Sequence, residues 1–70
     1  MDMLIKVTAI GIKTNISTNY FTEPLVTLVN PFKIFCAIPI KGGNTELRDE
    51  SGRNTIIVKE TPDEIYKLIQ

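Results

Sequence analysis

The stretch that decides the fold is PFKIFCAIPIK, residues 31–41, in which apolar side chains recur at every second position. This alternation predicts a β-strand, because successive side chains of a strand point to opposite faces of its sheet. One face is expected to join the core, and it carries Phe32, Ile34, Cys36, Ile38 and Ile40. The other face carries Lys33, Phe35, Ala37, Pro39 and Lys41. An interior strand needs the N–H that proline lacks, so Pro39 predicts an edge strand or a bulge.

Two turns and two further strands are expected after this strand. The sequence KGGN, residues 41–44, is typical of a hairpin turn, because glycine adopts positive φ without steric cost. TELRD, residues 45–49, then runs back as a polar strand, and residues 50–53 turn the chain again. NTIIVKE, residues 54–60, is the last strand, with one face that carries Ile56 and Val58. Strands and turns at this spacing indicate an antiparallel meander.

The first thirty residues predict less regular structure. LIKVTAI, residues 4–10, is rich in β-branched residues and predicts a strand. Residues 11–24 are rich in Thr, Asn and Ser, so we expect a loop with weak strand character. LVTLVN, residues 25–30, predicts a strand that stops before Pro31.

The last eleven residues, ETPDEIYKLIQ (60–70), carry dense signals for the start of a helix. Thr61 is a good N-cap, Pro62 suits the first helical position, and Glu64 completes a capping box. An isolated helix shorter than about 12 residues is marginal in water, so this helix must dock. It is expected to do so through Ile65, Leu68 and Ile69. The predicted fold is a single α+β domain, residues 1–70, in which an antiparallel meander of four to five strands packs its apolar face against one short C-terminal helix.

The amino-acid composition limits which interactions can stabilise this small domain. A chain of 70 residues buries a smaller fraction of its surface than a larger domain does and is marginal without further support. It has one cysteine and no histidine, which excludes an intrachain disulfide and a tetrahedral Cys/His zinc site. Self-association is therefore the expected support. The net charge is zero, and no signal peptide or membrane-spanning segment is recognisable, so the expected location is the cytoplasm.

No group of residues predicts catalysis, a cofactor or a metal. Cys36 lacks a histidine to activate it and is expected to be a small buried hydrophobic residue. The carboxylates on hairpin strands and element ends are expected to be solvated; they are Glu46, Asp49, Glu50 and Glu60. The Gly42-Gly43 pair precedes a strand rather than a helix and belongs to no phosphate-binding motif. We therefore expect a protein that is not an enzyme.

The C-terminal part of the sequence resembles a known family. Asn30, Gly43-Asn44-Thr45, Gly52 and the run IVKETPDEI, residues 57–65, are similar to the pattern of FlbD-like flagellar and swarming motility proteins. In that family a hairpin and a V-K-E-s/t-x-x-E-[IV] segment lead into a short terminal helix. The resemblance covers residues 29–70 and implies a small, non-catalytic, cytoplasmic protein without active-site residues.

A second resemblance involves the same terminal helix. VKETPDEIYKLIQ, residues 58–70, looks like the end of carbon-storage-regulator proteins, which are RNA-binding intertwined β dimers. The basic arm beside a V-G-E turn and the N-A-P segment of that family have no counterpart in this sequence.

Two functions from different classes remain open. The first is a self-associating interaction or scaffold module, whose partner is itself or another protein and whose candidate interface is Lys33, Phe35, Ala37 and Pro39. The alternative is a nucleic-acid-binding regulator, for which RNA is the expected ligand and aromatic residues could stack bases. The candidate nucleic-acid contacts are Lys41, Arg48, Arg53 and Lys59.

Overall fold

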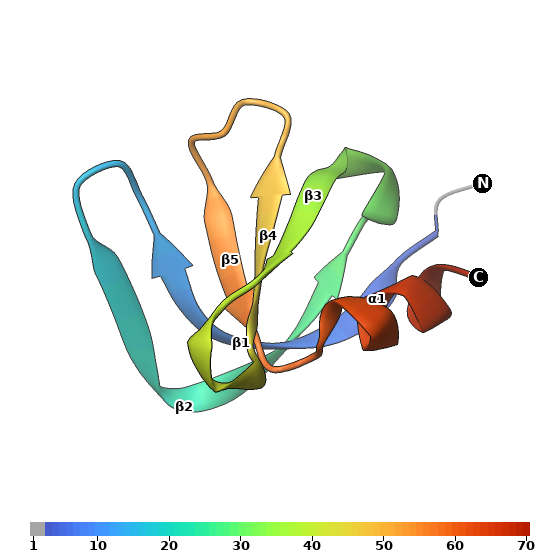
Figure 1. Ribbon diagram of the computed structural model, residues 1–70, viewed down its shortest axis with the longest axis horizontal. Helices are drawn as coiled ribbons and strands as arrows, with labels where there is room; N and C mark the ends of the chain where they lie inside the picture. The colour runs from blue at the N-terminus through green and yellow to red at the C-terminus, as the bar shows by residue number, and fades with distance from the viewer. Residues whose placement is uncertain (1–2) are drawn as a thin grey trace.

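The computed structural model describes residues 3–70, so the first two residues of the predicted domain lie outside the described part. It contains five strands and one helix, with short 3₁₀ turns at Pro31–Lys33 and Lys41–Gly43. The bounds are β1 Ile5–Lys13, β2 Thr18–Val29, β3 Ile34–Pro39, β4 Thr45–Asp49, β5 Thr55–Val58 and α1 Pro62–Ile69 (Figure 1). The predicted α+β fold, with an antiparallel sheet and one short C-terminal helix, is confirmed.

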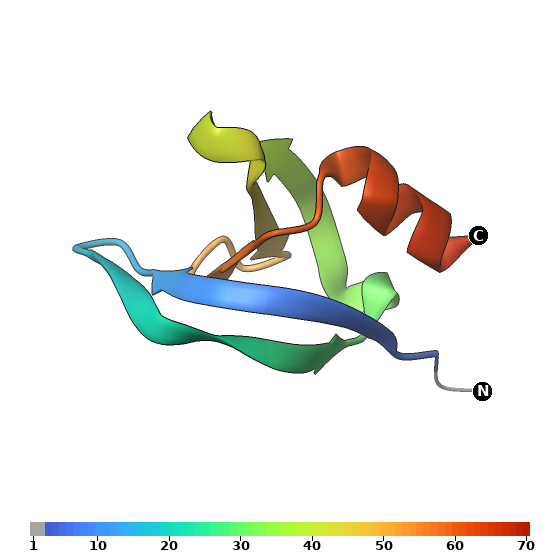
Figure 2. The ribbon, with the colours of Figure 1, turned by 90° about the horizontal axis from the view of Figure 1, so that it is seen from below.

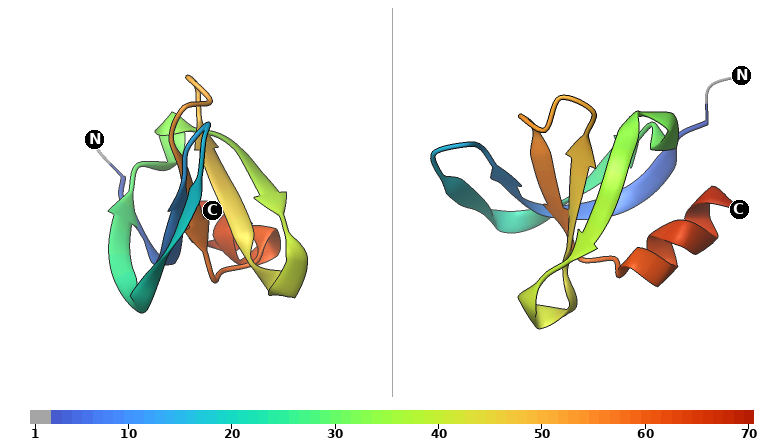
Figure 3. Two further views of the ribbon diagram at one scale, coloured as in Figure 1. Left: turned by 90° about the vertical axis from the view of Figure 1, so that its left-hand side faces the viewer. Right: turned by 45° about the horizontal axis from the view of Figure 1, so that its top comes forward.

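The strands form one antiparallel sheet in the order β2-β1-β5-β4-β3. The predicted meander therefore exists as β3-β4-β5, and a β1–β2 hairpin joins it through the pairing of β1 with β5. Figures 2 and 3 show that the sheet is strongly bent, with the β1–β2 hairpin in one arm and β3 and β4 in the other. β2 and β3, although consecutive in the chain, lie at opposite edges of the hydrogen-bonded order.

The loop predicted for residues 11–24 is wrong. Those residues complete β1, form a turn and supply the first half of β2. In the turn, the Thr14 N–H donates to the Ser17 carbonyl at 2.8 Å, and the Ser17 N–H donates to the Thr14 hydroxyl at 3.2 Å. Hydroxyl-rich composition suggested a loop, but here those hydroxyls hold a hairpin turn between paired strands.

The pairing of β1 with β2 is irregular in residues 11–24. This irregularity explains why apolar and polar side chains alternate only weakly there. Ala9 pairs with Leu25 and Gly11 pairs with Tyr20, so residues 21–24 of β2 lie opposite a single residue of β1. At Gly11 the strands approach so closely that a Cβ atom would lie 2.9 Å from the Asn19 carbonyl oxygen. A real Cβ does not tolerate that distance to backbone, which accounts for glycine at this position.

The core face predicted for β3 is also partly wrong. The pairing of β3 with β4 is irregular between Ile34 and Cys36, and beyond that point the two faces are exchanged. Cys36 and Ile38 pair with residues of the face opposite the core, whereas Ala37 pairs with the buried Leu47. Because side chains alternate with a period of two, one extra residue reverses the faces of all that follow. Of the five predicted core residues, Phe32 is the most clearly misplaced, since its side chain is exposed.

The core lies between the sheet and the helix. Its buried cluster combines β1, β4, β5 and α1 and consists of Ile5, Val7, Leu47, Val58 and Ile65. Ile34 and Ala37 of β3 pack against this cluster, and α1 contacts both β1 and β3. Of the predicted helix stripe only Ile65 is buried, because Leu68 and Ile69 remain exposed.

The start of α1 is built as the sequence predicts. The Thr61 hydroxyl accepts the Glu64 N–H at 3.2 Å, and the Glu64 carboxylate accepts the Thr61 N–H at 3.0 Å.

We expect Thr61→Ala to lower the free energy of unfolding by about 1 kcal/mol, because the first helical turn loses its side-chain acceptor. Urea denaturation monitored by circular dichroism measures this loss. Thr61→Ser keeps the hydroxyl and should recover most of it; equal loss in both variants would contradict the role of the cap.

Candidate functional site

The predicted interface lies on the edge strand β3, and the structure confirms that Pro39 belongs to an edge. Phe35 is 72% exposed, and Lys33 and Pro39 are exposed as well. Ala37 does not share this surface, because it packs against the core on the opposite side. Pro39 follows Ala37 by two residues and pairs with the buried Thr45, so it lies on the face of Ala37. The four residues therefore do not form one surface, and Phe35 is the large exposed side chain among them.

The other edge, β2, was not singled out by the sequence as a surface. Its 12 residues contain one charged side chain, Glu23. Residues 25–29 pair one-to-one with residues 5–9 of β1, so this half of the edge is regular. Several of its large apolar side chains are exposed, and Val26 is the most exposed at 76%. The apolar residues of LVTLV are visible in the sequence. Their pattern does not reveal, however, whether the strand lies at an edge or in the middle of the sheet.

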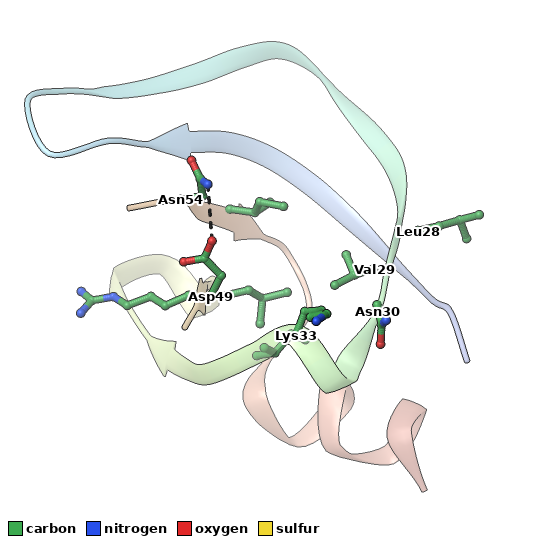
Figure 4. Close-up of a pocket in the computed structure, with 10 residues that line it drawn as sticks. Leu28, Val29, Asn30, Lys33, Asp49 and Asn54 are labelled. Carbon is green, nitrogen blue, oxygen red and sulfur yellow. Dashed lines mark hydrogen bonds between the residues drawn. The ribbon is translucent and has the colours of Figure 1, made fainter. Parts of the chain in front are cut away.

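A hollow of about 270 Å³ lies where the sheet remains open between β2 and β3. Its apolar lining includes Val29, Ile34, Leu47 and Ile56. In Figure 4, Val29 points toward the hollow and Leu28 points away from it. At the rim the Asn54 amide donates to the Asp49 carboxylate at 3.4 Å. The hollow thus joins the two exposed sheet edges through an apolar floor.

Asp49 also organises the turn between β4 and β5. Its carboxylate accepts hydrogen bonds from the Ser51 hydroxyl at 2.7 Å and from the Gly52 N–H at 3.0 Å. The Ser51 hydrogen bond, supported by those from Asn54 and Gly52, lowers the pKa of Asp49 below its ordinary value. The predicted turn at residues 50–53 is confirmed, and Gly52 adopts the positive φ that the turn requires.

Glu46 was predicted to be a solvated carboxylate, and this is wrong. Its side chain and backbone together are only 7% exposed, on the face of β4 away from the core cluster. Lys13 and Arg48 form ion pairs with its carboxylate at 3.4 and 3.1 Å. Burial acts to raise the pKa of Glu46, but hydrogen bonds from Arg48 and Lys13 and their positive charges outweigh it and lower the pKa below its ordinary value of 4.5. The buried carboxylate of Glu46 thus pairs with both Lys13 and Arg48. No pattern in the sequence indicated this association.

Glu60 is another carboxylate with a structural role. It accepts hydrogen bonds from the Thr8 N–H at 2.7 Å and from the Thr8 hydroxyl at 2.9 Å. The Glu60 carbonyl accepts the buried Thr45 hydroxyl at 2.6 Å. These bonds tie the segment before α1 to β1 and β4.

Cys36 was predicted to be buried in the core. It is instead half-buried on the other face of the sheet, opposite Arg48.

The four candidate nucleic-acid contacts lie at two ends of the sheet. Arg48 and Arg53 line a second hollow, of about 240 Å³, near the β4–β5 turn. Lys41 precedes β4 and Lys59 follows β5, which places both at the opposite end, where Thr45 pairs with Val58. The four residues therefore do not form one continuous stripe. The structure instead brings Lys13 of β1 to the two arginines.

Comparison with protein-family models, with characterised proteins and with solved structures gives no match for this chain. Among residues 3–70, no three Cys, Asp or Glu side chains are grouped so that they could hold a metal ion. In the same part of the chain, no helix is long and apolar enough to cross a membrane.

Proposed function

We propose that this protein is a small non-catalytic interaction module that pairs with a second copy of itself through the edge of β2. The observation that carries the proposal is the regular half of that strand, residues 25–29, which contains no charge and in which Leu25, Val26 and Leu28 are exposed. An exposed edge presents unpaired N–H and C=O groups that another strand can complete. Natural edges that avoid such pairing are usually protected by charges, bulges or proline. In β2 these features lie in residues 21–24, which carry Glu23, Pro24 and the irregular pairing, and residues 25–29 have none of them.

A second copy is the occupant that these features favour. In a two-fold dimer the same surface meets itself, and an uncharged strand does so without repulsion between like charges. The exposed apolar side chains of β2, such as Val26 and Leu28, would be covered at the same time. Pairing would also supply the additional buried surface that a domain of 70 residues lacks.

β3 supports this role less well, although the sequence pointed to it first. It is six residues long, its pairing is irregular, and Pro39 has no N–H to offer a new strand. Its exposed Phe35 provides a second apolar surface for another protein. We also propose a cytoplasmic location, as the resemblance of residues 29–70 to FlbD-like proteins implies.

The test is the mass of the assembly, measured by size-exclusion chromatography with light scattering over a range of concentrations. We expect wild type to approach twice the chain mass of 7.9 kDa and Val26→Lys to run as a folded monomer. Thr22→Lys is the matched control, because it adds the same charge to the irregular, exposed part of β2. It should leave the assembly mass unchanged.

Two outcomes would contradict the proposal. Wild type could be monomeric at every concentration, or Phe35→Glu could dissociate the assembly while Val26→Lys leaves it intact. The second result would move the interface to β3, as the sequence first suggested. Circular dichroism of each variant separates dissociation from unfolding.

A further inference from the structure

We infer that the hollow between the β1–β2 turn and the β4–β5 turn binds a phosphate group of a small molecule. The inference is independent of self-association, because it concerns residues outside the proposed β2 interface. The hollow has a volume of about 240 Å³ and is lined mainly by polar groups. Its three basic residues come from separate strands and a turn: Lys13, Arg48 and Arg53.

The buried Glu46 makes this group of cations a preorganised site. It pairs with both Lys13 and Arg48, whose side chains are nevertheless 42% and 41% exposed. One carboxylate thus fixes the position of two cations while leaving part of each available to solvent. Long side chains held in this way lose less conformational entropy when they bind a ligand than free ones do.

The charge around the hollow favours an anion. Among residues 3–70, Glu46 is the only carboxylate in an ion pair with these cations, so it balances one of three positive charges. Arg53 lies in the turn with an exposed side chain and has no ion-pair partner in that range. Asp49 lines the other hollow, and its oxygens accept hydrogen bonds within the β4–β5 turn. Within the described residues 3–70, no carboxylate lines the hollow itself.

The donor types suit a phosphate group better than a halide ion. Arginine offers a planar set of N–H donors that can bind two oxygens of one phosphate at once. Asn15 and Thr55, which carry an amide and a hydroxyl, are also among the lining residues. A phosphate dianion has enough acceptor oxygens to use donors from several directions, whereas a single-atom anion has no such geometry.

The extent of the site favours a small phosphorylated molecule over a nucleic-acid chain. A polymer backbone needs basic residues along a track of several phosphates. The other candidate contacts, Lys41 and Lys59, lie at the opposite end of the sheet. The exposed aromatic residues Tyr20 and Phe35 do not line this hollow. One confined cluster of cations therefore matches one phosphate or diphosphate group.

The test is a titration of ¹⁵N-labelled protein with sodium pyrophosphate, with ionic strength held constant by sodium chloride. We expect saturable chemical-shift changes confined to the amides of residues 13–15 and 52–55. Arg53→Gln should weaken the affinity about tenfold, since it removes one charge-assisted donor from an exposed position. Lys59→Gln removes the same charge at the opposite end and should leave the affinity unchanged.

Three results would overturn the inference. The first is the absence of saturable shifts, and the second is an equal effect of Arg53→Gln and Lys59→Gln, which would indicate general charge attraction. The third comes from a single-stranded oligonucleotide without terminal phosphates. If the oligonucleotide binds with steep salt dependence and pyrophosphate does not, the basic residues serve the nucleic-acid alternative instead.

Discussion

Ile57→Ala is expected to lower the free energy of unfolding by about 3–4 kcal/mol, the largest loss of any single substitution considered for this chain. Ile57 is 1% exposed in β5, which pairs with β1 on one side and β4 on the other. Its side chain lies on the same face as its partner Glu46, away from the core cluster, and its removal leaves a cavity there that the paired strands cannot close without disturbing their ladders. A domain of this size has a total stability of order 5 kcal/mol, so the variant should keep only about 1–2 kcal/mol and populate the unfolded state to roughly a tenth at 37 °C.

The matched control is Ile16→Ala, the same change of side chain at a position that is 94% exposed in the β1–β2 turn. It should alter stability by less than about 0.5 kcal/mol. Urea denaturation of both variants, followed by circular dichroism, gives the comparison. Equal midpoints for the two variants would show that β5 is not the packed centre of the sheet.

Glu46→Gln is expected to lower stability at neutral pH by about 2 kcal/mol, because the ion pairs to Lys13 and Arg48 lose their charge while the site stays buried. The loss should depend on pH. Since the folded protein lowers the pKa of Glu46 below 4.5, its ionised form stabilises the fold above that pH. This contribution is lost as the pH falls through the lowered pKa.

The stability difference between wild type and Glu46→Gln should therefore be largest at neutral pH and shrink as the pH falls below 4.5 and through the lowered pKa of Glu46. Thermal or urea denaturation at several pH values measures it. Glu50→Gln, at an exposed carboxylate in the neighbouring turn, serves as the control and should match wild type at neutral pH. A difference for Glu46→Gln that stays constant with pH would contradict the assigned ion pairs.

Local signals in the sequence predicted the second half of the fold well. The bounds of β4, the glycine turns and the capping box of α1 depend on residues within a few positions of one another. The predictions were wrong where pairing with another strand, rather than the residues' own local signals, decides the structure. Residues 11–24 are extended because they pair within the β1–β2 hairpin, and the faces of β3 exchange because of its irregular pairing with β4.

The predictions for the candidate sites divide in the same way: the residue types were recognised, but the contacts between strands were not. Arg48 and Arg53 were recognised as basic residues, but their association with Lys13 depends on the arrangement of β1, β5 and β4 in space. Glu46 was read as a surface residue because TELRD is polar, and polar composition does not reveal that a strand is covered. Alternation placed Ala37 beside Phe35, and only the register of β3 against β4 shows that Ala37 faces the core.

The pairing of β1 with β5 also has a consequence for how the protein is made. β1 lies near the start of the chain, and its partner β5 is translated only after the other three strands. The β1–β2 hairpin alone is at best marginally stable in water. Ile5 and Val7 therefore lack the strand and the helix that bury them until residues 55–69 have emerged from the ribosome. We expect this domain to remain unfolded until that point of translation and then to fold cooperatively, with its apolar β1 and β2 accessible to chaperones until then.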